Sequence, residues 1–353
     1  MGIGSPKKVL GIFVLAMLNV SVMASLRNLP LVAEYGLSAI FFFALVALLF
    51  LIPCALISAE LATGWSKEGG VYLWVREAFG DKWGFFAVWV QWAHNLSWYP
   101  AILSFVATTL AYVFEPRLAN NPLFILTVIL SSFWGMTLLN YLGIRTSSLF
   151  STFGVIGGTI IPGLFIIALG GYWMFSGQPI QIEISTKALI PDITGINQLV
   201  FLAGMFLAFA GLEVTAAHAK YVVNPQKNYP RAMLLSALIT FFLFMLGSLA
   251  IAIVIPRSQI SLVSGLMEAF SLFFNAYGFA YLLPLLALLL AIGAIAEVNS
   301  WIIGPVKALY ASRSHGNLPP LLQKTNQHGT PTYLLLTQAL IVSLAALVFL
   351  KMP

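Results

Sequence analysis

Apolar residues run in stretches of about 20 along almost the whole chain, and short polar connectors separate these stretches. A helix of that length rises about 1.5 Å per residue and crosses a hydrocarbon core of roughly 30 Å. A membrane barrel would show shorter, alternating segments. We therefore predict an all-α integral membrane protein with about nine transmembrane helices. The expected spans are 9–35, 37–61, 83–113, 122–142, 148–175, 196–219, 231–255, 278–311 and 332–350.

Composition agrees with lipid as the main solvent of the chain. Of the 353 residues, 60% are hydrophobic and only 8% are charged, with a mean hydropathy of +0.95. This is more apolar surface than one water-soluble core of this length can bury. The run from Val9 lacks a cleavage site followed by a soluble domain, so we expect it to stay as the first helix. The single cysteine, Cys54, excludes an internal disulfide and a multi-cysteine metal site, and no cofactor is predicted.

The net charge of +6 is spread over the connectors rather than gathered in one patch, so nucleic acid is not an expected partner. If the N-terminus is cytoplasmic, the inner connectors carry twelve Lys and Arg residues and the outer ones carry four. This bias follows the positive-inside rule and predicts a multi-pass protein with a cytoplasmic N-terminus. Oligomeric state leaves no signal in the sequence.

Two connectors, 62–82 and 256–277, have the apolar spacing of helices and are expected to lie along the membrane faces. The chain stops directly after the ninth span. We expect residues 1–353 to form one transmembrane domain that continues beyond this C-terminus.

Helix breakers lie beside charges in two of the predicted spans. The first span, VSVMASLRNLPLVAEYG, places Arg27 and Pro30 near the middle of the bilayer. Pro30 removes an amide and disfavours helix at the preceding residue, so we predict an interruption at residues 25–29. The sixth span, FLAFAGLEVTAAHA, places Gly211 and Glu213 at a similar depth. Broken helices in a bilayer need protein or a water-filled cavity around the break.

Interrupted spans five helices apart are typical of inverted repeats that build a central site. We expect a first repeat at about 9–175 and an unfinished second repeat at about 196–350. Amides at the half-helix N-termini suit a carboxylate and freed carbonyls suit an ammonium, so an amino acid would match the site. The alternative is close helix packing at Gly211 and an ordinary kink at Pro30.

Ionisable groups inside the spans need a partner, a cavity or neutralisation. Glu213 and Glu297 suit proton-coupled or pH-gated transport, and the alternative is an internal ion pair of Arg27 with one of them. Trp301 follows Glu297 by four positions, so the two side chains share a helix face. An aromatic wall beside a substrate is expected there.

Three stretches carry a resemblance to the amino acid/polyamine/organocation (APC) superfamily of transporters, and more closely to the bacterial glutamate/γ-aminobutyrate antiporters. They read IPCALISAELATGWSKEGGVYLWV, FAGLEVTAAHAKYVVNPQKNYPRAMLL and AIAEVNSWIIGPVKALYASRSHGNLPP. The resemblance covers essentially the whole chain. It implies a bacterial inner-membrane protein of twelve helices with a five-plus-five inverted repeat, which exchanges substrates by alternating access.

The same resemblance implies a set of substrate-binding residues. Glu213, Glu297 and Trp301 would line the central pathway. Backbone at two helix breaks would hold the carboxylate and amino groups of the substrate, around Ser25 and Leu26, and around Ala210 and Gly211.

The chain departs from the antiporters at SLRNLP, where they carry a tyrosine-bearing sequence. Arg27 therefore favours an acidic, glutamate-like substrate, or else neutralises Glu213. Exchange of an amino acid for a related one or for a decarboxylation product is the predicted function. Proton-coupled amino acid uptake is the alternative. An intramembrane enzyme lacks its motifs here, and a channel or receptor lacks a lined pore or a signalling domain.

Overall fold

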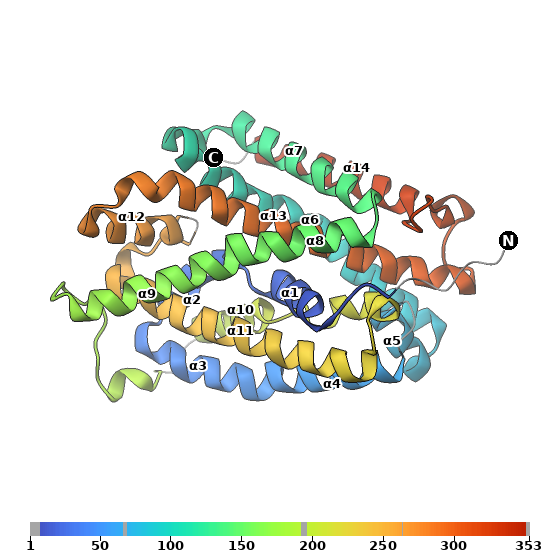
Figure 1. Cartoon of the computed structure of the whole chain (residues 1–353), viewed down its shortest axis with the longest axis horizontal. Helices are drawn as coiled ribbons and strands as arrows, with labels where there is room; N and C mark the ends of the chain where they lie inside the picture. Colours follow the sequence, from blue (N-terminus) through green and yellow to red (C-terminus); the bar gives the residue numbers. More distant parts are fainter. Residues whose placement is uncertain (1–7, 66–68, 192–195, 263, 351–353) are drawn as a thin grey trace.

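A computed structural model describes residues 8–65, 69–191, 196–262 and 264–350. Helices form the regular structure of these residues, and two isolated β-bridges join Leu10 to Val222 and Thr325 to Pro331. Figure 1 shows the long helices crossing the molecule in roughly one direction, with the connectors gathered at its two ends. The predicted all-α architecture is confirmed for the described part of the chain.

Seven helical stretches among the described residues are long and apolar enough to cross a membrane. They are Ile12–Ala33, Gly36–Gly64, Asp81–Phe114, Pro122–Tyr141, Ile144–Phe175, Pro225–Val254 and Ala280–His315. In chain order the elements are α1 (Ile12–Met23), η1 (Leu26–Asn28), α2 (Leu29–Ala33), η2 (Gly36–Ser38), α3 (Ala39–Val46), η3 (Ala47–Leu51), α4 (Ile52–Gly64), α5 (Val71–Phe79), α6 (Asp81–Phe114), η4 (Pro116–Asn120), α7 (Pro122–Tyr141), α8 (Ile144–Val155), η5 (Ile156–Ile160), α9 (Ile161–Phe175), η6 (Lys187–Leu189), α10 (Ile196–Ala208), η7 (Val214–Tyr221), α11 (Pro225–Val254), η8 (Arg257–Gln259), α12 (Gly265–Tyr277), η9 (Ala280–Leu282), α13 (Leu283–Ala311), η10 (Ser312–His315), η11 (Pro320–Gln323), α14 (Thr332–Ala346) and η12 (Leu347–Leu350).

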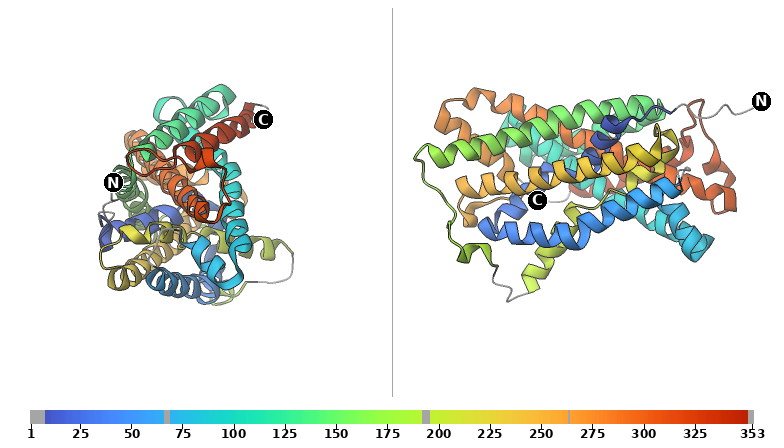
Figure 2. Two further views of the ribbon diagram at one scale, coloured as in Figure 1. Left: turned by 90° about the vertical axis from the view of Figure 1, so that its right-hand side faces the viewer. Right: turned by 60° about the horizontal axis from the view of Figure 1, so that its bottom comes forward.

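Each of the nine expected spans has a helical counterpart, and two of these counterparts are short. The expected span 196–219 is α10 followed by η7, with a break between them. The expected span 332–350 is α14, an apolar helix of 15 residues, followed by η12. The helices expected in the connectors are α5 and α12, which lie at opposite ends of the molecule (Figure 1 and Figure 2).

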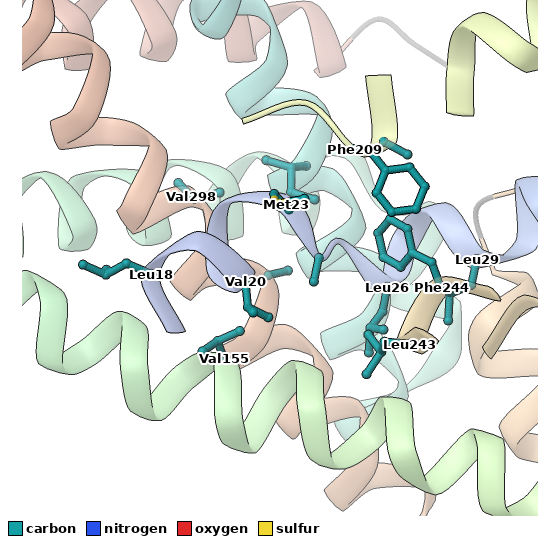
Figure 3. Packing of buried hydrophobic residues seen from close by; sticks show 14 of the residues in the cluster. Leu18, Val20, Met23, Leu26, Leu29, Val155, Phe209, Leu243, Phe244 and Val298 are labelled. Carbon is teal, nitrogen blue, oxygen red and sulfur yellow. The ribbon is translucent and has the colours of Figure 1, made fainter. Parts of the chain in front are cut away.

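Helix α1 lies in the centre of the molecule. Its residues Leu15–Met23 are all buried. Figure 3 shows Val20 near Val155 of α8, and Leu26, just beyond α1, near Leu243 of α11. Because protein surrounds this helix, its backbone can leave the helical path without exposing unpaired groups to lipid.

Glycine permits a close crossing of two helix backbones in the core, those of η5 and α13. A Cβ atom on Gly158 of η5 would lie 2.2 Å from the Gly293 amide nitrogen of α13, and one on Gly293 would lie 2.4 Å from the Gly158 carbonyl oxygen. Small residues at such crossings let transmembrane helices pack backbone to backbone. This crossing fixes the part of α13 that precedes Glu297.

Candidate functional site

The break in the first span follows α1 directly. The Ala24 amide donates to the Val20 carbonyl over 2.7 Å, and Ser25 then adopts an extended backbone with φ −87° and ψ 105°. The interruption predicted at residues 25–29 is present, but Leu29 is helical and Pro30 lies in the first turn of α2. Pro30 therefore does not end a helix, because the first turn has no partner for the amide that proline lacks.

The break in the sixth span lies between α10 and η7. Ala210 and Gly211 have no helical assignment, and Gly211 has a φ of +117°, which favours glycine. A Cβ atom at Gly211 would lie 2.6 Å from Cγ1 of Val22 and 3.0 Å from Cζ2 of Trp301. The two broken spans and α13 therefore meet at this residue.

The Glu213 carboxylate binds groups close to this break. Its Oε2 accepts a hydrogen bond of 3.2 Å from the Gly211 amide, and its Oε1 accepts one of 3.3 Å from Nε2 of Gln91 on α6. The bond from Gly211 satisfies a backbone amide that the break leaves outside both helices. Glu213 thus ties α6 to the break.

A cavity of about 370 Å³ lies between the two breaks. This volume falls within the usual range for small-molecule sites. It is lined by Val22, Met23, Ser25, Arg27, Asn28, Leu31, His94, Asn95, Trp98, Gly204, Leu207, Ala208, Ala210, Leu262, Glu297 and Trp301. Five of the eight residues predicted to bind substrate are on this wall, namely Ser25, Arg27, Ala210, Glu297 and Trp301.

The other three predicted residues lie beside the cavity rather than on its wall. Leu26 lines a separate hollow of about 10 Å³, too small for an amino acid, together with Ser25 and Glu297. Gly211 packs against Trp301, and Glu213 faces Gln91. The structure therefore brings all eight residues to one region but gives them different surroundings.

Two ionisable side chains, Arg27 and Glu297, line this cavity. Glu297 is only 5% exposed. Within the described ranges, no carboxylate lies within 4.0 Å of the Arg27 guanidinium, so the ion pair considered from the sequence is not a direct contact. A guanidinium without a contact partner and a buried carboxyl are groups that a zwitterion can bridge.

Trp301 forms one wall of the cavity and is held in place from two sides. Its Nε1 donates a hydrogen bond of 2.9 Å to the Val22 carbonyl, and its own carbonyl accepts one of 2.9 Å from the Tyr99 hydroxyl. The Trp98 ring lies 5.7 Å away, centroid to centroid. The expectation that Trp301 and Glu297 share a helix face agrees with their common position on the cavity wall.

Helix α6 supplies three wall residues that sequence reasoning did not assign to the site: His94, Asn95 and Trp98. Asn95 is only 2% exposed, and its Nδ2 has no hydrogen-bond partner among the described residues. A polar residue within an apolar span is the signal that could have found Asn95. The described residues contain no group of three or more His, Cys, Asp or Glu side chains that could hold a metal ion.

Backbone contacts join the start of the first span to the end of the sixth at the α5 end of the molecule (Figure 1). There the Val9 amide donates to the Tyr221 carbonyl and the Val223 amide donates to the Leu10 carbonyl, both over 2.9 Å. The Lys307 ammonium lies 4.4 Å from the centre of the Tyr221 ring. At the other end the lining reaches Leu262, in the connector before α12.

Long apolar helices and a central cavity between two broken spans are the features of a multi-pass membrane transporter. The sequence pattern of the amino acid permease family matches residues 10–351, and the chain belongs to this family. An uncharacterized transporter of Legionella pneumophila is 42% identical over 344 residues, which cover 98% of this chain and 74% of that protein. A glutamate/gamma-aminobutyrate antiporter of Lactococcus lactis is 33% identical over 344 residues, which cover 96% of this chain and 68% of the antiporter.

A solved structure shows the same fold. The crystal structure of MhsT in complex with L-phenylalanine aligns with a TM-score of 0.67 at 15% identity and covers 96% of this chain and 79% of that one. Together with the two broken spans, this likeness confirms the predicted inverted-repeat transporter fold.

Proposed function

We propose that this protein exchanges an acidic, glutamate-like amino acid for a related amino acid or a decarboxylation product. The observation that carries the proposal is the cavity at the meeting point of two broken spans, with Arg27 and Glu297 on its wall. The similarity to a glutamate/gamma-aminobutyrate antiporter supports it.

In this proposal each group of the substrate has a complementary partner. Backbone at Ser25 and Leu26, and at Ala210 and Gly211, would hold the α-carboxylate and the ammonium, because the positive N-terminal and negative C-terminal ends of half-helices attract these two groups. Arg27 would bind the additional carboxylate of an acidic side chain. Glu297 and Trp301 would bind the ammonium and the aliphatic stem.

Alternating access would then open and close the two ends of the cavity in turn. We propose that the repeats at about 9–175 and 196–350 rock against each other, with the N-terminus in the cytoplasm of a bacterial inner membrane. In this orientation the contacts of Val9 and Leu10 with Tyr221 and Val223 would close the cytoplasmic end, and the cavity would face outward.

Exchange is tested by counterflow. The full chain in proteoliposomes should take up labelled glutamate when unlabelled glutamate or γ-aminobutyrate is inside, and should take up little when the lumen is empty. Uptake that does not depend on the internal substrate would contradict exchange. Absence of transport with all twenty amino acids and their decarboxylation products would end the proposal.

Proton-coupled uptake is the alternative, because Glu297 is a buried carboxyl on the cavity wall. Glu297→Gln separates the two mechanisms. Proton coupling through Glu297 predicts that pH-driven accumulation is lost while exchange continues. Loss of exchange as well would assign Glu297 to substrate binding or gating.

A further inference from the structure

A second large cavity, which we call the peripheral cavity, lies where the first span passes into the second. Its volume is about 360 Å³, and it shares no lining residue with the central cavity. Its walls come from the turn after α2, the connector that follows α9, the end of α11, and η8 with the residues beside it. The Gln181 amide donates a hydrogen bond of 2.9 Å to the Ile253 carbonyl, which holds the connector against the end of α11.

Three charged side chains line the peripheral cavity: Glu34, Glu183 and Arg257. Within the described ranges, none of the three has a group of opposite charge within 4.0 Å. The guanidinium carbon of Arg257 lies 5.8 Å from the centre of the Tyr35 ring, which also lines the cavity. A ligand that carries both an ammonium and an anionic group would therefore find partners for both charges here.

The peripheral cavity adjoins the side of the molecule that faces lipid. Only 22% of the most apolar window of the second span is buried, and α3 in this span lies at the edge of the molecule in Figure 1. The connector helix η6, which contributes Ala188 to the cavity wall, packs against η2 and the start of α3. In the same connector, Ile184 is 59% exposed and Ile190 is 73% exposed. Large apolar side chains exposed beside a span indicate contact with the membrane.

We propose that the peripheral cavity binds the headgroup of a phospholipid with a primary ammonium, namely phosphatidylethanolamine. Glu34 and Glu183 accept hydrogen bonds from the ammonium, and Arg257 donates to the phosphate. Ile184 and Ile190 contact the acyl chains. A free amino acid has the same two kinds of charged group, but it leaves the exposed isoleucines without a partner.

Other phospholipids lack one part of this match. The nitrogen of phosphatidylcholine carries three methyl groups and donates no hydrogen bond to a carboxylate. Phosphatidylglycerol has no cation. Both keep the phosphate that Arg257 binds. The two carboxylates should therefore select the lipid, whereas the arginine should strengthen the binding of all three.

Native mass spectrometry of the full chain tests the proposal, with release from micelles that hold equal amounts of the three lipids with identical acyl chains. Phosphatidylethanolamine should be retained about tenfold more than either of the others, as expected for a charge-assisted hydrogen bond. Glu34→Gln and Glu183→Gln should each reduce this preference, and Arg257→Gln should weaken retention of all three lipids. Arg117→Gln is the matched control, at a 92% exposed side chain of η4 outside the cavity, and should keep the preference.

The comparison of lipids on the unmodified chain needs no variant, so it holds even if a substitution prevents folding. Equal retention of the three lipids overturns the inference. A preference that persists when both carboxylates are replaced overturns the assignment to the peripheral cavity. Release of phosphatidylethanolamine by an excess of free γ-aminobutyrate would show that an amino acid occupies the cavity instead of a lipid.

Discussion

The indole nitrogen of Trp301 donates a hydrogen bond of 2.9 Å to the carbonyl oxygen of Val22. Helix α1 ends one residue later, at Met23, so this carbonyl is among the last four of the helix that lack a partner within it. A side chain of α13 therefore completes the broken end of α1. The Tyr99 hydroxyl holds the Trp301 carbonyl in turn, so three spans meet through one tryptophan.

Trp301→Phe should destabilise the protein by about 1–3 kcal/mol, because it retains an aromatic ring but leaves the Val22 carbonyl unpaired. Thermal unfolding of the purified variant measures this loss. Trp89→Phe is the matched control at an exposed position of α6 and should change stability by less than about 0.5 kcal/mol. Equal unfolding temperatures for the two variants would show that the Val22 contact contributes nothing.

Gly211→Ala should abolish transport. A Cβ atom there would lie 2.6 Å from Val22 and 3.0 Å from Trp301, and the φ of +117° is unfavourable for any residue with a side chain. Gly171→Ala, in α9 with no atom within 4 Å of the new Cβ, should transport normally. Counterflow by Gly211→Ala at the rate of Gly171→Ala would contradict the close approach.

The sequence predicted the spans and both breaks because their signals are local. Runs of apolar residues, Gly211, and the charged residue near Pro30 each lie within one span. They therefore indicate the length of that span or its break, whatever the span packs against. Which residues of α6 face the cavity is a tertiary property, so the sequence did not assign His94 and Asn95 to its wall, although Asn95 is a polar residue within an apolar span.

The sequence also did not predict the direction in which individual side chains point. Glu213 lies in the second broken span as predicted, but its carboxylate turns to the Gly211 amide and to Gln91. No spacing rule distinguishes that arrangement from one in which the carboxylate points into the cavity. Pro30 is a similar case, because proline can either end a helix or begin one. The sequence predicted an interruption that included Leu29, but Leu29 and Pro30 form the first turn of α2.

Tyr72→Phe should destabilise the connector between the second and third spans. The Tyr72 hydroxyl donates to Oδ1 of Asp81 over 2.6 Å and lies 2.8 Å from Nδ1 of His315. Loss of a hydrogen bond to a charged group should cost about 1.5–3 kcal/mol near neutral pH. Tyr281→Phe, at an exposed position, is the control and should leave the unfolding temperature unchanged.

The same tyrosine predicts an alkaline transition. Burial, and then the hydrogen bond to Asp81, raise the pKa of Tyr72 from its ordinary value of 10.0 to about 12. Since the folded state holds this proton more tightly than the unfolded state, the contribution to stability is complete below pH 10 and is lost as the pH rises towards 12. The unfolding temperature should fall less steeply above pH 10 in Tyr72→Phe than in the unmodified chain. Parallel curves would refute this assignment.

Arg27 should decide the preference for an acidic substrate, because its guanidinium lines the cavity without a contact ion pair among the described residues. Arg27→Gln removes a charge-assisted contact of about 1.5–3 kcal/mol, so exchange of glutamate should fall by about tenfold to a hundredfold in kcat/KM. Glutamine exchange should fall much less. Arg27→Lys keeps the charge but loses the planar fork and should be intermediate. If Arg27→Gln reduces glutamate and glutamine exchange equally, the guanidinium does not bind the side-chain carboxylate of the substrate, and its partner is Glu297 instead.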